Sequence, residues 1–348
     1  MVPVSVCIPV YNGENYLEEC LNSVLNQTFK NFEVIIVDDQ SSDASFEIGR
    51  KYGGIDNRLR VFQNDRNLGL VNNWNRCIEL SHGEWIKFVF QDDLIELNCL
   101  EKMIKVAMLE RGMVVCRRRI VFDNVGFKTR KTFKKYSRRM SIDAVFQGAS
   151  DISPNDFCNA VIDNLGYNFI GEPTAVMMHR SAFEKIGRFN PRFIQLCDFE
   201  FFSRIGCNLG LRYIPETLAT FRVHPKAMSL ISRDTQKLRM ESCDLLLLYH
   251  EFVYNPIFQQ MRNIALHRRP EINLKRLLAF ESIRARSIAK SLHRKSLGAA
   301  PSPIDELNSF LKDHPAIDNI PTSKWLKLLG PLIRNRRIFM LLYRHILN

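Results

Sequence analysis

The stretch that decides the fold class of this chain is VSVCIPVYN, residues 4–12. Residues 4–9 form a short β-rich run, and apolar side chains then recur at helical spacing between Tyr16 and Leu25. A second β-rich run at residues 32–37 stops at the polar sequence DDQSSD, residues 38–43. Short strands that alternate with amphipathic helices are typical of βαβ units, so we predict an α/β fold with a mostly parallel sheet flanked by helices.

The same alternation continues to residue 93. We predict a strand at residues 59–63, a helix at 70–80, and a strand at 85–90 that leads directly into QDD, residues 91–93. Acidic pairs therefore follow two of the predicted strands. Because ligands of open α/β sheets bind beyond the carboxyl ends of the strands, we expect these two pairs to meet in one crevice.

Each acidic pair has two interpretations when it is taken alone. Asp92 and Asp93 offer the oxygen ligands that a divalent cation on a nucleotide diphosphate requires, but two solvated acids in a turn would give the same sequence. Asp39 can accept a hydrogen bond from the N–H of a base, or it can cap the next helix. The residues alone leave these alternatives open.

The domain organisation follows from length and pattern. A chain of 348 residues exceeds the usual size of one domain, so we predict a large domain at residues 1–234 and a helical, basic extension at 235–348. Within the large domain, residues 1–115 and 140–234 form two halves, and the second half includes a predicted strand at 175–179 and a helix at 181–187.

The net charge of +12 is unevenly distributed. Residues 117–139 carry 10 basic and 1 acidic residue, and residues 235–348 carry 19 and 9, whereas the remainder carries 20 and 27. We therefore expect an acidic body with two basic segments. On charge alone, such segments suit phosphorylated substrates, anionic lipid or nucleic acid equally well.

Cysteine usage and apolar runs indicate the compartment. The nine cysteines show neither CxxC pairs nor the spacing of metal ligands, so we expect reduced thiols in a cytoplasmic protein. The first residues lack the basic segment of a secretion signal, and no run approaches the roughly 18 apolar residues of a membrane-spanning helix. Between Trp325 and Ile346, however, apolar residues interleave with lysine and arginine. Such basic amphipathic helices bind a membrane surface or a partner, and a packed C-terminal helix is the alternative.

Several ordered motifs between residues 3 and 110 together resemble the family 2 glycosyltransferases, which have the GT-A fold. They are IPVYN at 8–12, Ser23 with NQTF at 26–29, VDDQSSD at 37–43, NLG at 67–69, Asn75, GEWI at 83–86 and QDD at 91–93. The resemblance implies an inverting enzyme that transfers a sugar from a nucleotide-sugar donor to an acceptor hydroxyl. It also implies that residues 1–115 bind the donor and that residues 140–234 bind the acceptor.

The resemblance assigns donor-binding roles to Pro9, Tyr11, Asn12, Asp39 and Asp92. Among these, Asp39 matches the residue that contacts the base, and Asp92 matches a residue near the ribose. Asp93 matches the carboxylate that binds Mn2+ or Mg2+ at the diphosphate. Many members carry a further aspartate two residues before Asp92, where this chain has Phe90, which places an additional ligand in doubt.

Three later segments resemble the acceptor half of the family. The sequence at residues 172–183 matches the segment that leads to the acceptor site and suggests Glu172 on the acceptor side. CDFEFFSR at 197–204 resembles the helix that carries the catalytic base, with Asp198 at the base position and Cys197 where a glutamate is usual. His224 occupies a position from which a histidine can approach the metal, and a core or capping histidine is the alternative.

The sequence therefore predicts metal-assisted, inverting transfer from a nucleotide sugar, expected to be a UDP-sugar, to a hydroxyl of a glycan or lipid-linked acceptor. The basic segments extend this prediction to surface-polysaccharide synthesis at the inner face of the membrane, with peripheral membrane contact through the C-terminal helices. These motifs do not set the sugar, the linkage or the oligomeric state.

Two other classes of protein are alternatives to a glycosyltransferase. A sugar-1-phosphate nucleotidylyltransferase requires a Gly-rich phosphate loop with an arginine near its N-terminus, and PVYNG at 9–13 is not such a loop. A non-enzymatic nucleic-acid binder would use the basic segments. No recognisable nucleic-acid module accompanies them, so we expect no nucleic-acid partner.

Overall fold

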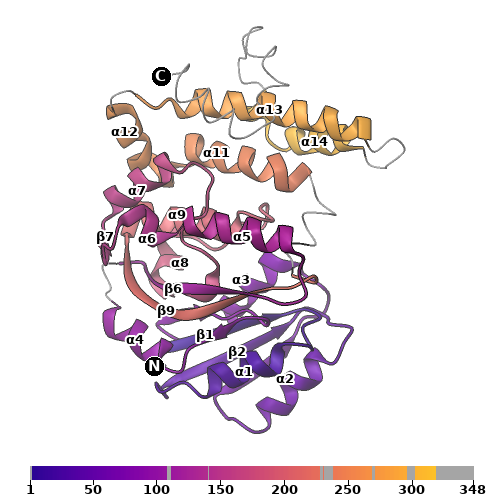
Figure 1. Cartoon of the computed structure of the whole chain (residues 1–348), viewed down its shortest axis with the longest axis vertical. Helices are drawn as coiled ribbons and strands as arrows, with labels where there is room; N and C mark the ends of the chain where they lie inside the picture. Colours follow the sequence, from indigo (N-terminus) through magenta and orange to yellow (C-terminus); the bar gives the residue numbers. More distant parts are fainter. Residues whose placement is uncertain are drawn as a thin grey trace. The chain divides into compact units, whose positions relative to one another are not determined.

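The structure is a computed structural model that describes residues 2–107, 111–139, 141–227, 230, 238–268, 271–295 and 302–318. The chain divides into two compact units, whose elements are labelled in Figure 1. The first unit comprises residues 1–192 and 197–227, and the second comprises residues 193–196 and 228–348. The border predicted at residue 234 falls outside the described residues.

The first unit begins with four parallel strands in the spatial order β3-β2-β1-β4. They are β1 (Val4–Val10), β2 (Phe32–Asp38), β3 (Leu59–Gln63) and β4 (Trp85–Phe88), and they alternate with α1 (Leu17–Leu25), α2 (Ser45–Gly53) and α3 (Leu70–Leu80). Every residue of β1 and β2 is buried, as expected for parallel strands covered on both faces. The predicted βαβ half is confirmed. The last strand ends at Phe88 rather than at residue 90, because the N–H of Asp93 donates to the carbonyl of Phe90 and closes a turn.

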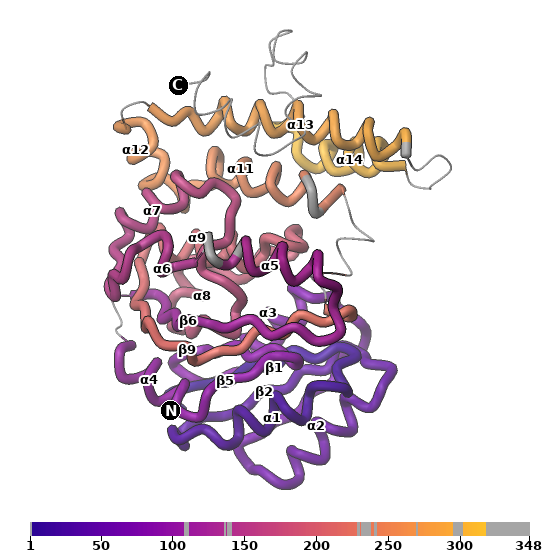
Figure 2. The backbone as a smooth tube through the Cα atoms, in the orientation of Figure 1, coloured from indigo at the N-terminus to yellow at the C-terminus, as the bar shows by residue number. Residues whose placement is uncertain are grey.

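The second half of the sheet contains strands of both senses. β8 (Val176–His179) is antiparallel to β4, and β6 (Met113–Phe122) is antiparallel to β8. β9 (Leu211–Val223) is parallel to β6 and lies beside it in Figure 2. The short strands β5 (Leu94–Ile95) and β7 (Asp151–Ile152) pair with β9 and complete nine strands. β6 and β9 run in the same sense as the first four strands, and the shorter β8, β5 and β7 run in the opposite sense. The sheet is therefore mixed, because β8 follows the 3-10 helix η1 (Pro173–Ala175) and enters beside β4 in the reverse direction.

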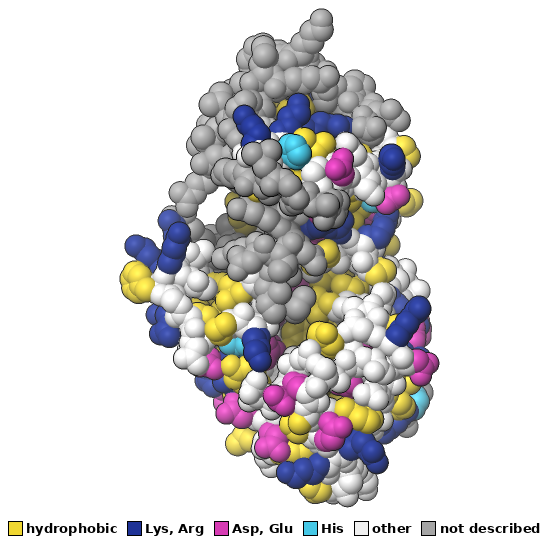
Figure 3. All heavy atoms as spheres, turned by 90° about the vertical axis from the view of Figure 1, so that its right-hand side faces the viewer, with side chains coloured by type: hydrophobic (Ala, Val, Ile, Leu, Met, Phe, Trp, Pro, Cys, Tyr) yellow, Lys and Arg dark blue, Asp and Glu magenta, His cyan; other side chains and the backbone are white. Residues whose placement is uncertain are grey.

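Six further helices belong to the first unit. They are α4 (Cys99–Val106), α5 (Phe127–Arg139), α6 (Ile142–Phe146), α7 (Pro154–Asp163), α8 (Arg180–Ile186) and α9 (Cys197–Leu209). α9 is buried along most of its length, and its phenylalanines contact those of neighbouring segments. The lower part of Figure 3 shows acidic side chains on the surface of this unit, interspersed with lysine and arginine.

The basic segment at residues 117–139 divides between the end of β6 and α5. The ring of Phe133 on α5 packs edge-on against Phe122 of β6, with 6.3 Å between ring centroids. The guanidinium of Arg130 lies 5.9 Å from the centroid of the same Phe122 ring. α5 contains seven lysines and arginines and no acidic residue. An aromatic contact therefore anchors a helix whose cationic side chains are exposed between residues 128 and 135.

The second unit is helical, as predicted for the C-terminal extension. Its α-helices are α11 (Asp244–Tyr254), α12 (Gln259–His267), α13 (Leu274–Lys295), α14 (Pro303–Lys312) and α15 (Pro315–Asp318), with a π-helix at Arg239–Cys243 and a 3-10 helix at Pro256–Phe258. No helix within the described ranges is both long enough and apolar enough to cross a bilayer. The basic amphipathic segment predicted between residues 325 and 346 lies outside the described residues.

Candidate active site

The loops that follow β1, β2 and β4 are joined by hydrogen bonds at the carboxyl end of the parallel strands. The backbone N–H of Tyr11 donates to Oε1 of Gln91 at 2.8 Å, and Nε2 of Gln91 donates to the carbonyl of Tyr11 at 3.0 Å. The N–H of Ser42 donates to Oδ1 of Asn12 at 2.8 Å. A side chain at Gly13 would overlap that of Gln91, so glycine permits this approach. Both loops that carry the acidic pairs are thus hydrogen-bonded to the loop after β1, and the meeting of the two pairs in one crevice stays a prediction.

Asp39 organises the loop that precedes α3. Its Oδ1 accepts hydrogen bonds from Nδ2 of Asn64 at 2.7 Å and from the N–H of Leu68 at 2.8 Å, and its Oδ2 accepts one from the N–H of Gly69 at 2.9 Å. The residue is buried. Gly69 is the N-cap of α3, so the carboxylate satisfies donors at the start of that helix. The contact of Asp39 with a base stays a prediction.

Asp93 is completely buried beneath the site. Its Oδ1 accepts a hydrogen bond from the N–H of Arg222 at 3.0 Å, and its Oδ2 accepts one from the hydroxyl of Thr174 at 2.5 Å. Burial, together with the neighbouring charge of Asp92, raises the pKa of Asp93 well above its ordinary value. Both oxygens therefore face protein donors, and the assignment of Asp93 as the metal ligand stays a prediction.

A buried lysine lies behind the same segment. Lys87 of β4 donates hydrogen bonds from its ammonium group to the backbone carbonyls of Thr174 and Phe88. The side chain is wholly excluded from water, and this burial lowers its pKa. Lys87 therefore fixes the backbone of η1 at Thr174, and the hydroxyl of Thr174 in turn donates to Asp93.

Asp92 differs from its neighbour because its side chain is partly exposed. Nε2 of His224 and Oδ2 of Asp92 are 2.9 Å apart, and the imidazole lies 4.6 Å from the ring centroid of Tyr16. The guanidinium of Arg222 stacks over the same tyrosine at 4.7 Å and donates to the backbone carbonyl of Asp92 at 2.9 Å. The phenol donates to Oδ2 of Asp123, and burial with this hydrogen bond raises the pKa of Tyr16 to about 12. The structure thus brings Asp92 and His224 together, as a pair of potential metal ligands.

Asp198 lies in the first turn of α9. Its Oδ2 accepts a hydrogen bond from Nδ2 of Asn168 at 3.1 Å, and its Oδ1 accepts one from the N–H of Phe199 at 2.6 Å. Burial is the largest cause that raises its pKa to about 7; the charge of Glu172 raises it further, and that of Arg118 opposes the rise. Glu172 also forms an ion pair with Arg118, so two side chains of opposite charge lie beside this carboxyl group.

A second ion pair fixes the helix that carries Asp198. The carboxylate of Glu200 accepts two hydrogen bonds from the guanidinium of Arg204, at 2.7 and 2.9 Å. The same guanidinium donates to the backbone carbonyls of Ile186 and Arg188, at 2.7 and 2.6 Å. Both charged side chains are buried. Because a buried pair of this kind tolerates few geometries, α9 is held in one orientation relative to the end of α8.

Sequence reasoning missed several residues that shape the site. They are Tyr16, Lys87, Arg118, Asn168, Thr174 and Arg222. Thr174 and Arg222 belong to segments that resemble the family, but their hydrogen bonds to Asp93 have no sequence signature. For Lys87 the sequence does offer a signal, because a lysine in the middle of a buried strand predicts hydrogen-bond partners in the interior. Asn168 and Arg118 lie in parts of the chain without a motif.

The structure thus combines a mixed β-sheet, flanked by helices, with two acidic centres, one at the carboxyl end of the parallel strands and one in the first turn of α9. The sequence profile described as Glycosyl transferase family 2 matches residues 5–187, which is more than half of the chain. The chain belongs to this family of glycosyltransferases. It is also 32% identical over 243 residues to a Bacillus subtilis protein named "Putative glycosyltransferase EpsH", covering 68% of this chain and 64% of the relative. The chain therefore spans just under two thirds of that relative's length.

Solved structures share the fold. The S. aureus protein TarS, residues 1–349, in complex with UDP-GlcNAc has a TM-score of 0.59 at 21% identity, with 98% of this chain and 89% of that chain covered. A mannosyltransferase from Pyrobaculum calidifontis in complex with GDP-Man and Mn2+ has a TM-score of 0.51 at 15% identity, with coverages of 98% and 87%. The GT-A fold predicted from the motifs is confirmed.

Proposed function

We propose that this glycosyltransferase transfers a sugar, with inversion, from a UDP-sugar to a hydroxyl of a glycan or lipid-linked acceptor, with Asp198 as the general base. The observation that supports this most strongly is the environment of Asp198. It lies in a buried helical turn, is oriented by Asn168, and has a pKa of about 7. A carboxyl group that is half ionised near neutral pH can accept a proton more readily than an ordinary aspartate can.

The reaction is a single displacement. The acceptor oxygen attacks the anomeric carbon and forms the new glycosidic bond, and its proton passes to the carboxylate of Asp198. The bond between the anomeric carbon and the diphosphate oxygen breaks on the opposite face, and the nucleoside diphosphate leaves with the electron pair. A positioned base of this kind contributes about 10²–10⁴ in rate. Attack opposite the leaving group inverts the anomeric configuration.

For the donor, we propose that Pro9, Tyr11, Asn12 and Asp39 line the nucleoside pocket. The support is that the loops after β1 and β2 meet there through the hydrogen bond between Asn12 and Ser42. The side chain of Tyr11 is exposed, so its ring is accessible to a base. TarS, which shares the fold, was solved with UDP and with UDP-GlcNAc, and this motivates the choice of a UDP-sugar.

For the metal, Mn2+ or Mg2+, the resemblance implies Asp93 as a ligand, but both of its oxygens accept hydrogen bonds from protein donors. We therefore propose that Asp92 and His224 would hold the cation, together with the diphosphate. Asp92 and His224 would supply one oxygen and one nitrogen; in the structure Nε2 of His224 and Oδ2 of Asp92 are 2.9 Å apart, within hydrogen-bond distance. Within the described residues, no cluster of three or more such side chains occurs. Asp93 would orient these ligands from behind through the backbone of Arg222. When bound, the cation would offset the charge that develops on the leaving diphosphate.

A panel of nucleotide sugars with Mn2+, scored for binding and for slow hydrolysis, tests the donor and the metal. Asp92→Asn and Asp93→Ala should each weaken metal-dependent UDP binding. If Asp93→Ala binds UDP with Mn2+ as tightly as the wild type does, Asp93 is neither a ligand nor a positioning residue.

The catalytic base has its own test. Asp198→Asn should retain donor binding and lose transfer, since the amide cannot accept the acceptor's proton. Normal transfer by this variant would refute the assignment.

We also propose that the enzyme acts in surface-polysaccharide synthesis at the inner face of the cell membrane, with peripheral membrane contact. The support is the basic charge of residues 117–139 and 235–348. Each cation near an anionic leaflet contributes about 1 kcal/mol, so a few such contacts suffice for peripheral binding. Co-sedimentation with anionic vesicles should be lost when residues 320–348 are removed. A full-length protein that stays wholly in the supernatant would exclude membrane contact.

A further inference from the structure

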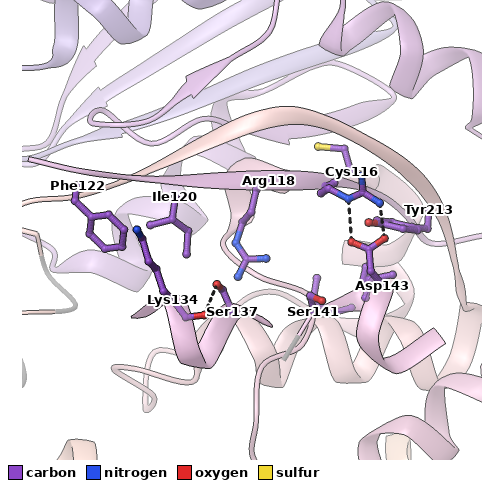
Figure 4. A pocket seen from close by; sticks show the side chains of 12 residues that line it. Cys116, Arg118, Ile120, Phe122, Lys134, Ser137, Ser141, Asp143 and Tyr213 are labelled. Carbon is purple, nitrogen blue, oxygen red and sulfur yellow. Dashed lines mark hydrogen bonds and ion pairs between the residues drawn. The ribbon is translucent and has the colours of Figure 1, made fainter. Parts of the chain in front are cut away.

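A cavity of about 270 Å³ lies between β6 and the helices α5 and α6. Its lining includes Arg118, Ile120, Phe122, Lys134, Ser137 and Ser141. Figure 4 shows Arg118 pointing from the strand, and Lys134 from the helix, into this space. The volume is close to the lower limit of small-molecule sites, about 300–1,000 Å³, and so suits one small polar group rather than a chain.

The cations of the cavity differ in how they are neutralised. Arg117 is fully paired, because its guanidinium donates twice to the carboxylate of Asp143, at 2.9 and 2.8 Å. Arg118 forms an ion pair with Glu172 through Nε, and the described residues provide no hydrogen-bond partner for its two outer nitrogens. Lys134 has no acidic partner in the described part of the chain. The cavity therefore contains one unneutralised ammonium group and one guanidinium with donors to spare.

The backbone beside the cavity is shaped around Arg118. Gly171 has a φ of +108°, which favours glycine, and a Cβ atom there would overlap the guanidinium. The preceding residue, Ile170, lines the cavity, and Asn168 two residues earlier donates to Asp198. The positive charge of Arg118 also lowers the pKa of Asp198. The cavity is thus adjacent to the proposed catalytic base.

We propose that this cavity binds a phosphate group carried by the acceptor; the proposal rests on Asp198 being the base. The hydroxyl that reacts would lie at Asp198, and a phosphate on the same molecule would lie between Arg118 and Lys134. Phosphate suits this lining because its several oxygens can accept from a guanidinium, an ammonium group and the hydroxyl of Ser141 at once, whereas the hydroxyl of Ser137 already donates to the carbonyl of Lys134. The seven cations of α5, without an acid among them, further favour an anion at this end of the site.

The test is a binding titration of the full-length protein with four small probes and, separately, with anionic vesicles. Glycerol 3-phosphate represents a phosphate within a glycan, and a short prenyl-diphosphate sugar represents a lipid carrier. Glycerol and glucuronate are the neutral and the carboxylate controls. The variant is Lys134→Glu, and the matched control is Lys131→Glu, an exposed lysine of the same helix that does not line the cavity.

The proposal predicts that a phosphate probe binds more tightly than both controls and that Lys134→Glu weakens its binding at least about tenfold, the loss expected for one charged hydrogen bond. Lys131→Glu should change it less than about twofold, as is usual for an exposed charge. Whichever phosphate probe binds more tightly identifies the source of the phosphate. Equal binding of glucuronate, or equal loss in both variants, would overturn the proposal. Anionic vesicles that bind when neither phosphate probe does would show a membrane surface instead.

The enzymatic arm separates this inference from the proposed function. Release of UDP from a UDP-sugar panel is measured for the wild type with and without a phosphorylated acceptor. If no nucleotide sugar binds or reacts, the proposed function fails whatever the titration shows. If transfer occurs equally well to an acceptor and to its phosphorylated form, the function stands and the phosphate site is wrong.

Discussion

Replacing Glu172 by glutamine changes the charge beside the proposed base while preserving the shape of the side chain. In the wild type, the Glu172 carboxylate raises the pKa of Asp198, and the guanidinium of Arg118 lowers it. Glutamine removes the first charge and leaves Arg118 without its ion-pair partner. Both effects favour the ionised form of Asp198, so the pH at which the base becomes active should fall.

The size of the change follows from the structure. The pKa of Asp198 is raised from 3.8 to about 7, mainly by burial, which corresponds to roughly 4 kcal/mol against the charged form. A charge within about 4–6 Å changes a carboxyl pKa by about 1–3 units, and the partly buried Glu172 belongs at the lower end of that range. The midpoint should therefore fall by about one pH unit. At pH 6 the ionised fraction of Asp198 would rise from about 10% to about 50%.

The assay is kcat/KM for sugar transfer between pH 5 and 9, with each variant normalised to its own plateau at high pH. This normalisation separates the titration from any effect of Glu172 on acceptor binding. Glu184→Gln, which changes an exposed acid on α8, serves as the matched control and should keep the wild-type midpoint. A midpoint for Glu172→Gln that is unchanged or higher would refute the electrostatic coupling. A flat wild-type profile would refute Asp198 as the titrating base.

Three further predictions concern stability. The pKa of Asp198 is higher in the folded than in the unfolded state, so its contribution to stability is complete below about pH 4 and is lost as pH rises through about 7. Asp198→Asn should therefore raise the free energy of unfolding by up to about 4 kcal/mol at pH 8 and change it little at pH 4. Urea titrations at both pH values measure this difference. Thr174→Val leaves the buried Asp93 one donor short and should cost about 1–3 kcal/mol, which thermal denaturation measures, whereas a serine at 174 should restore most of it. Gly171→Ala should cost about 1–3 kcal/mol through its positive φ and its overlap with Arg118, and a melting temperature equal to that of the wild type would contradict this.

The parallel half of the fold was predictable because periodicity reports burial directly. The runs at residues 4–10 and 32–38 are mostly apolar, with Ser5, Glu33 and Asp38 as the polar exceptions, and strands covered on both faces require such runs. The mixed half of the sheet was harder to predict from the sequence. β6 begins with buried residues and then becomes partly exposed and basic, so the sequence of its second part is typical of a charged loop rather than a strand. The pairing of β6 with β9 joins residues about a hundred positions apart, which local patterns do not report.

The candidate site shows the same division between local and distant information. Motifs located the loops after β1, β2 and β4, and the hydrogen bonds between them confirm that they converge. The contrast between Asp92 and Asp93 was not predictable, because burial distinguishes two adjacent identical residues only once β9 and η1 are in place. The roles of Asp39, Asp93, Asp198 and His224 in binding and catalysis stay predictions until the variants are measured.

The carboxylate of Asp93 has a consequence for the order in which the protein can assemble. Its two hydrogen-bond donors, Thr174 and Arg222, are translated long after it. A nascent chain that has emerged to residue 110 holds every motif of the parallel half, yet it lacks both hydrogen-bond donors and also lacks β8, which separates β4 from β6 in the finished sheet. Because domains fold during synthesis as their parts appear, the parallel half can complete its interior only when residues up to 222 have left the ribosome. Any fragment that ends before residue 222 would carry the family's signature without a finished site.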